Sequence, residues 1–131
     1  MKKLLISTAL ILLSAISVFG QTCEWAEGIA GSQQESVLSI AVDALGNVYV
    51  AGHFYSDTLN FNNNISLYKT GIHDAFIAKF NSKGTCLWAE KIAGVDWDVA
   101  WSIAIDGSGN VILAGYFGAS TLNFNNGISL N

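Results

Sequence analysis

The sequence contains no arginine, and charged residues of either sign make up only 12% of its 131 positions. Beyond Lys2 and Lys3, four lysines stand against ten acidic residues, which gives that part of the chain a net charge of about −6. A surface of this sign repels the phosphate backbone of nucleic acids. The composition therefore excludes nucleic acid as a partner, and the 51% of hydrophobic residues excludes a disordered chain.

Signatures of catalysis and cofactor binding are also missing. The sequence has no glycine-rich phosphate loop, no Asp-box of the sialidase type and no Trp-Asp dipeptide at a predicted strand end of the WD40 type. Outside the N-terminus, no segment has the 3.6-residue hydrophobic period of an amphipathic helix. We therefore predict an all-β chain that is not an enzyme, with no catalytic residue, no cofactor and no metal ligand.

The first 20 residues have the pattern of a signal peptide. Lys2 and Lys3 form a basic start, and an apolar stretch then runs to Phe19. The stretch is shorter than the roughly 20 residues of a membrane-spanning helix. Cleavage is expected after Gly20, which predicts a secreted or cell-surface protein without a membrane span after cleavage; a retained anchor is the alternative.

Two cysteines, Cys23 and Cys86, are the only thiols. Lipidation of Cys23 would need a small residue before it, whereas Thr22 stands there. The two cysteines occupy equivalent positions of a repeat, so they would lie farther apart than the roughly 5.5 Å between Cα atoms that a disulfide requires. Two buried free thiols are therefore predicted in preference to a disulfide.

An internal repeat of about 63 residues is the strongest signal in the sequence. Shifting the chain by this length aligns about 46 positions without a gap, and about 26 of them are identical. The hexapeptide Thr-Leu-Asn-Phe-Asn-Asn occurs at 58–63 and again at 121–126. A repeat of this length indicates an array of equivalent structural units.

Each repeat has the local pattern of four short strands. The first two, 39–42 and 47–54, are separated by Asp43-Ala44-Leu45-Gly46, which suits a turn that ends in a left-handed glycine. Asp106-Gly107-Ser108-Gly109 repeats this turn in the second unit. Strands at 74–80 and 85–92 meet across Asn81-Ser82-Lys83-Gly84.

The strand at 47–54 is apolar on both faces. Val48 and Val50 point to one side, while Tyr49 and Ala51 point to the other. A strand covered on both faces fits sheets stacked on either side, as in blades packed around an axis, and small residues such as Gly52 would let a neighbouring sheet come close. The predicted fold is a β-propeller of four-stranded antiparallel blades.

The repeat resembles the SBBP family, named for a seven-bladed β-propeller. The resemblance rests on Ser-Ile-Ala-Val-Asp, Gly-Asn-Val-Tyr-Val-Ala-Gly-His-Phe, Asp-Ala-Phe-Ile-Ala-Lys-Phe and Leu-Trp-Ala, and it covers nearly all residues after the leader. It implies a signal peptide at 1–20, an orphan strand at 21–30 that closes the last blade of the ring, a first blade at 31–93 and a partial second blade at 94–131. The chain is thus expected to be an incomplete part of a larger propeller, packed against further blades.

Few side chains are candidates for a site. His53 and His73 lack the partners of a metal site or a catalytic triad, and His53 is interpreted as a surface or interface residue. Asp96 and Asp98 flank Trp97, but the neighbouring residues do not supply the six or more oxygen ligands that calcium needs. This stretch is interpreted as an acidic loop without a metal.

Asparagine and tryptophan are the remaining candidates. The Asn-rich stretch 60–64 could present amides to a glycan, but its recurrence in both repeats favours a structural loop anchored by Phe61. Trp25 and Trp88 are predicted to be core residues. Trp97 and Trp101 have no tryptophan counterpart in the first repeat and are the better candidates for specific binding.

Two functions stay open at this point. The first is a non-catalytic extracellular scaffold or binding module whose ligand is a protein or a glycan. The second is a secreted propeller enzyme that acts on polysaccharide, with its catalytic residues outside these blades. Similarity between the repeats favours the first function, because an enzyme breaks its symmetry at the active site.

Overall fold

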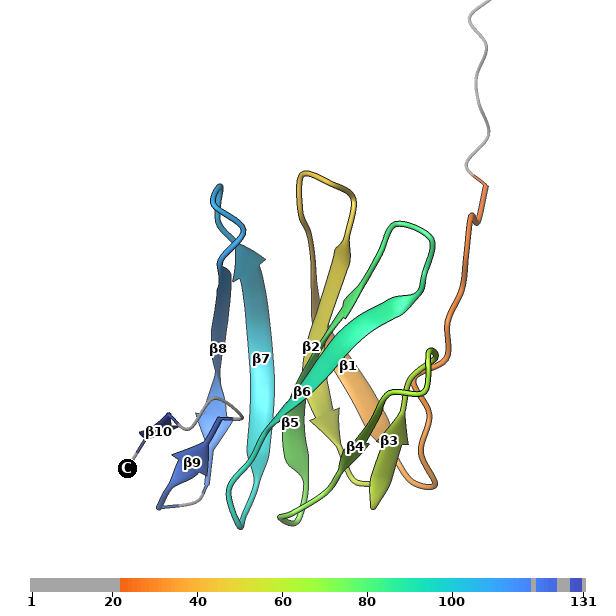
Figure 1. Ribbon diagram of the computed structural model, residues 1–131. Helices are drawn as coiled ribbons and strands as arrows, with labels where there is room; N and C mark the ends of the chain where they lie inside the picture. The colour runs from red at the N-terminus through yellow and green to blue at the C-terminus, as the bar shows by residue number, and fades with distance from the viewer. Residues whose placement is uncertain (1–21, 119, 125–127, 131) are drawn as a thin grey trace, which may run out of the picture.

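The computed structural model describes residues 22–118, 120–124 and 128–130, and all regular structure within them is β-strand (Figure 1). The predicted signal peptide lies outside the described residues. Ten strands follow one another along the chain: β1 (Glu35–Val42), β2 (Val48–Phe54), β3 (Thr58–Asn60), β4 (Ser66–Tyr68), β5 (Asp74–Phe80), β6 (Cys86–Ile92), β7 (Asp98–Ile105), β8 (Val111–Phe117), β9 (Leu122–Asn123) and β10 (Ser129–Leu130). Among the described residues, no helix is long and apolar enough to span a bilayer.

The first repeat forms a four-stranded antiparallel sheet in the order β1-β2-β5-β6. The second repeat contributes β7 and β8, which pair in the same register as β1 and β2. The prediction of a four-stranded antiparallel blade is confirmed for the first repeat. Figure 1 shows β7 and β8 beside the first sheet.

The first sheet is covered on both faces, as the pattern of β2 predicts. One face carries a cluster that we call the Phe76 cluster, composed of Val50, Phe54, Leu59, Phe61, Leu67, Phe76, Ala78, Phe80 and Cys86. The other face carries the inter-sheet cluster, composed of Tyr49, Ala51, Ala75, Ile77, Ile92, Ala100, Ile103 and Leu122. Because the inter-sheet cluster draws on both repeats, it fastens the two sheets to each other.

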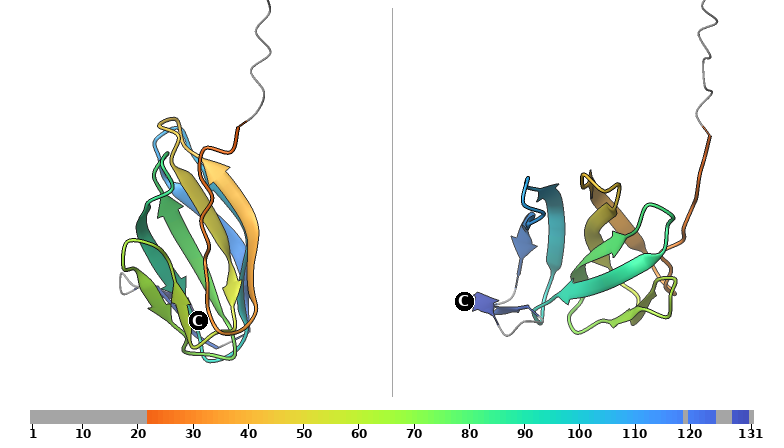
Figure 2. Two further views of the ribbon diagram at one scale, coloured as in Figure 1. Left: turned by 90° about the vertical axis from the view of Figure 1, so that its right-hand side faces the viewer. Right: turned by 45° about the horizontal axis from the view of Figure 1, so that its top comes forward.

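The first strands of the two repeats lie close together. β7 contacts β1, β2 and β5, and the Ile103 N–H donates a hydrogen bond to Ser39 Oγ at 3.2 Å. Figure 2 shows the two sheets as neighbouring layers with the N-terminal segment on the far side of the first. This stacking is the arrangement of adjacent propeller blades.

The turn between β1 and β2 has the predicted geometry. Gly46 has φ = 78°, and its counterpart Gly109 has φ = 83°, so both occupy the left-handed region that favours glycine. Asp43 accepts hydrogen bonds from the backbone N–H groups of Leu45 and Asn47, both at 2.9 Å. The bond from the Asn47 side chain contributes most to lowering the pKa of Asp43 to about 2.

The Asn-rich stretch is a hairpin as well as a loop, which the sequence did not predict. β3 and β4 pair across it, and Asn63 and Asn64 have left-handed φ values of 61° and 58°. Asn62 donates to the Gly84 carbonyl at 2.7 Å and accepts the Cys86 N–H at 2.6 Å. Both ends of the Asn62 amide therefore bond to backbone groups of the fold, which supports the interpretation of 60–64 as a structural loop and not a glycan site.

Phe61 anchors this hairpin, as predicted. Its side chain is buried in the Phe76 cluster, with ring centroids 6.0 Å from Phe76 and 6.3 Å from Phe80. Thus the hairpin packs against one face of the first sheet (Figure 1).

The segment before β1 differs from the orphan strand predicted at 21–30. Residues 22–29 form no strand, and only Ala30 pairs with Asn60. Trp25 stacks on Phe80 at 6.1 Å, so the segment packs against the Phe76 cluster. Closure of a last blade by this segment stays a prediction.

The prediction of two buried thiols is wrong for one of them. Cys86 is free and buried, whereas Cys23 is free and exposed. Cys23 belongs to residues 22–29, which form no strand, and its side chain lies exposed beside the described part of the fold.

Candidate functional site: an aromatic groove between the sheets

A groove of about 460 Å³ lies where the end of β2 and the start of β5 meet the second repeat. Its lining is almost entirely aromatic: His53, Tyr55, His73, Trp97, Val99, Trp101 and Tyr116. The repeat counterparts of Trp97 and Trp101 are Gln34 and Leu38. The groove therefore gathers residues at which the two repeats differ.

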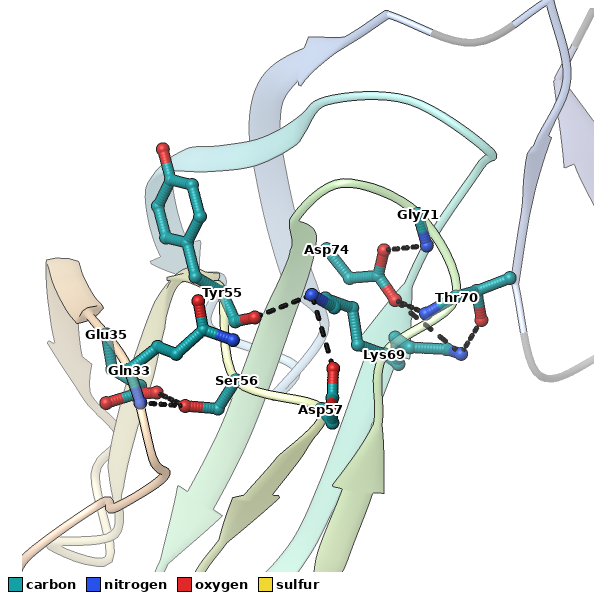
Figure 3. Close-up of polar contacts among 10 residues, drawn as sticks. Gln33, Glu35, Tyr55, Ser56, Asp57, Lys69, Thr70, Gly71 and Asp74 are labelled. Atoms are coloured by element: carbon teal, nitrogen blue, oxygen red, sulfur yellow. Dashed lines mark hydrogen bonds and ion pairs between the residues drawn. The ribbon is translucent and has the colours of Figure 1, made fainter.

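His53 and Tyr55 reach the groove from β2 and the turn that follows it. The Tyr55 N–H donates to the Gln34 carbonyl at 3.0 Å, and Lys69 Nζ donates to the Tyr55 carbonyl at 2.7 Å. Figure 3 shows Lys69 held between this carbonyl and Asp57, with the Tyr55 ring directed away from them. The backbone of Tyr55 is thereby fixed from two sides.

Ser56 adds a third fastening at the same turn. Its Oγ accepts the Gln33 N–H at 2.7 Å and donates to a Glu35 carboxylate oxygen (Figure 3). The turn after β2 is consequently tied to the residues before and at the start of β1.

His73 belongs to the first repeat but is fastened to the second. The Asp98 N–H donates to the His73 carbonyl at 3.1 Å, and His73 Nδ1 lies 3.1 Å from the Asp98 carbonyl oxygen. His73 also forms a parallel bridge with Trp97 and is only 2% exposed. These contacts fix its ring at the junction of the two sheets.

The rings form a chain of direct neighbours. Centroid distances are 5.0 Å for His53 and His73, 4.6 Å for Tyr55 and His73, and 5.3 Å for His73 and Trp97. These separations lie within the range of attractive aromatic pairs. His73 is at the centre of these contacts, so four of the rings that line the groove form one connected cluster.

Trp101 enters through a β-bulge. The register of β7 with β8 shifts between Ala100 and Ser102, which leaves Trp101 without a partner across the ladder. Bulges re-aim a side chain, and Trp101 is 58% exposed here, while Trp97 is 52% exposed. Two large indole surfaces are therefore available to a ligand.

Two histidines are the basic side chains in the lining of the groove. Burial lowers the pKa of His53, and the neighbouring His73 lowers it further. His53 Nδ1 is buried and has no hydrogen-bond partner among the described residues. Because the ordinary pKa of histidine is already about 6.5, this lowering keeps His53 neutral near pH 7.

Two buried carboxylates stand behind the groove. Asp74 is fully buried and accepts the backbone N–H groups of Thr70 at 2.6 Å and Gly71 at 2.9 Å (Figure 3). Lys91 Nζ lies 3.7 Å from Asp74 Oδ2. The Asp74 side chain therefore holds the loop before β5 through these contacts.

Asp98 corrects the interpretation of 96–98 as an acidic loop. It is the first residue of β7, fully buried, and its Oδ2 accepts the Gly94 N–H at 2.5 Å. Burial is the main cause of a raised pKa at Asp98. Within the described ranges, no three His, Cys, Asp or Glu side chains gather as metal ligands.

The structure shows which of the residues singled out in the sequence lie in the core and which line the groove. Trp25 packs against the Phe76 cluster and Trp88 against the inter-sheet cluster, but both are only half-buried, so the prediction of core residues holds in part. His53 lies at the interface between the sheets, as expected. Tyr55 and Tyr116 were missed, and the only signal was that each differs from its repeat counterpart.

Comparison with known proteins supports the repeat architecture. An uncharacterized WD repeat-containing protein of Acanthamoeba polyphaga mimivirus is 30% identical to the chain over 89 residues. The match covers 62% of this chain and 6% of the viral protein, so the chain spans a small part of that relative's length. No protein-family model matches the chain. Together with the stacked antiparallel sheets, the similarity identifies the fold as β-propeller blades.

Proposed function

We propose that the protein is a non-catalytic β-propeller binding module that takes its ligand in the aromatic groove. One observation carries this proposal: residues that break the repeat gather in a single groove of about 460 Å³. Repeat positions that serve only the fold stay alike, whereas a binding site is built once. The similarity to a WD repeat-containing protein is consistent with a scaffold of this kind.

The chemistry of the groove favours a neutral glycan. Exposed indole rings offer flat apolar surfaces for the C–H faces of a sugar. No acidic residue and no lysine lines the groove. A glycosidase would need two carboxyl groups facing its substrate, which this lining does not supply.

Family and location complete the proposal. The SBBP pattern of the first repeat, with its first two strands recurring in the second, supports a place among exported propeller repeat proteins. The basic and apolar residues before Gly20 support export. We expect the secreted protein to begin at Gln21. N-terminal sequencing of material from the culture medium checks this, and a chain that retains Met1 or carries a lipid on Cys23 would refute it.

The groove itself is tested by substitution. Trp97→Ala and Trp101→Ala should each weaken binding to a responsive member of a panel of soluble neutral oligosaccharides by about tenfold or more, because each removes an exposed indole surface from the groove. Isothermal titration calorimetry measures the change.

Tyr68→Ala is the matched control, since Tyr68 is an aromatic residue on β4, 68% exposed and outside the groove. It should leave the affinity unchanged. Equal losses for all three variants, or no oligosaccharide that binds, would reject the glycan groove.

A further inference from the structure

A second cavity, separate from the aromatic groove, lies beside β8. It has a volume of about 170 Å³ and a mostly apolar lining. Ala75 and Ile92 border it from the first sheet, and Leu113, Gly115 and Phe117 border it from β8. Residues after β8 close another side: Leu122, Phe124 and Leu130.

The lining reproduces one half of the Phe76 cluster. Under the 63-residue shift, five lining residues of the second repeat are the counterparts of five members of that cluster. The pairs are Leu113 with Val50, Phe117 with Phe54, Leu122 with Leu59, Phe124 with Phe61 and Leu130 with Leu67. The cavity is therefore the second repeat's version of the same core.

In the first repeat, β5 fills this space. Phe76 pairs with Gly52 across the ladder and is fully buried between Phe54 and Phe61. Gly52 corresponds to Gly115, which lines the cavity. An aromatic ring opposite Gly115 would thus occupy the position that Phe76 holds in the first repeat.

The volume suits that ring. An apolar cavity of roughly 150 Å³ is known to hold benzene, and this one is about 170 Å³. The backbone adds a second element, because within the described residues β8 pairs only with β7. Its other edge carries N–H and C=O groups that an incoming strand can bond.

We propose that β8 and this cavity bind an unpaired strand of the β5 pattern, Asp-Ala-Phe-Ile-Ala-Lys-Phe, by antiparallel strand addition. By the register of β2 with β5, the first Phe lies opposite Gly115, the Ala opposite Leu113 and the second Phe opposite Val111. Main-chain bonds supply affinity, and the two Phe side chains supply specificity.

The partner is an unpaired strand and not a folded second copy of this chain. In the folded chain, β5 is paired on both edges, with β2 and with β6, so it has no free edge to offer. The inference does not depend on the glycan groove, whose lining shares only Val99 and Tyr116 with this cavity.

The test uses a fluorescent peptide with the sequence of residues 70–93, which contains β5 and β6, and the purified full chain under reducing conditions. Fluorescence anisotropy should show saturable binding. Phe76→Ala in the peptide should weaken binding about 30-fold or more, because it removes the ring that fills the cavity. Ile77→Ala is the matched control: Ile77 points to the opposite face of the strand, so its loss should be at most about threefold.

Hydrogen–deuterium exchange gives an independent readout. Peptide binding should slow the exchange of amides in β8 and leave the amides of β1 unchanged. Binding that responds equally to both peptide variants, protection at β1 in place of β8, or absence of binding would each overturn the proposal. So would sedimentation that shows the chain dimerised with β8 already protected.

Discussion

Replacing Phe76 by alanine is expected to lower the free energy of unfolding by about 3–5 kcal/mol. Phe76 is fully buried, and its ring lies 6.3 Å from Phe54 and 6.0 Å from Phe61. Truncation removes the ring that joins β5 to the β3–β4 hairpin and leaves a cavity at the centre of the Phe76 cluster. Urea denaturation of the full chain, followed by tryptophan fluorescence, measures the loss.

Leu45→Ala serves as the control for this experiment. Leu45 lies in the turn between β1 and β2 and is 83% exposed, so its truncation should change the free energy of unfolding by less than about 0.5 kcal/mol. If the two variants unfold at the same urea concentration, the Phe76 cluster is not the core of the first sheet.

The repeat made most of the fold predictable. Alternation in β2 placed Val50 and Tyr49 on opposite faces, and both faces are indeed covered. The turn between β1 and β2 was predictable from Asp43 and Gly46. Capping by a side chain and a left-handed glycine depend only on residues close together in the sequence. Such features depend on neighbours along the chain.

Features that depend on distant neighbours were harder to predict. β3 and β4 have three residues each, too few for an alternating pattern to stand out. The extended segment around Trp25 has a strand-like sequence, but it packs against a hydrophobic cluster and not along a strand edge. The Trp25 side chain is therefore partly buried without β-ladder hydrogen bonds.

The aromatic groove was only half visible in the sequence. Trp97 and Trp101 stand out in the sequence because the other repeat lacks them, whereas His53 and His73 lack the sequence partners of a metal site or a catalytic triad. The packing of β7 against the end of β2 brings these rings together, and no spacing along the chain encodes that contact. Positions that differ between repeats were the useful signal.

Gly52 is required for close packing, as the sequence suggests, but the neighbour that it admits is a different one. The sequence suggested that its small size admits a neighbouring sheet. In the structure, the close neighbour is β1 of the same sheet: an added methyl group would overlap the Ser36 carbonyl oxygen and lie 2.9 Å from its carbon. Gly52 therefore permits the bulged pairing of β1 between Val37 and Ser39.

From this contact we expect Gly52→Ala to lower the free energy of unfolding by about 3 kcal/mol, since backbone atoms of a paired strand cannot move aside as a flexible side chain can. Displacement of β1 would also disturb the hydrogen bond from Ile103 to Ser39. Thermal and urea denaturation measure the loss, and the exchange rates of β1 amides locate it.

Two further glycines make this last prediction specific. Gly115→Ala should destabilise in the same way, because its methyl group would overlap the Val99 carbonyl oxygen at the equivalent bulge. At Gly107 no atom lies within 4 Å of an added methyl group, so Gly107→Ala should be neutral or stabilise by up to about 1 kcal/mol through the unfolded chain. A Gly52→Ala variant as stable as Gly107→Ala would show that β1 does not approach β2 this closely, and the bulges that re-aim Leu38 and Trp101 would lose their basis.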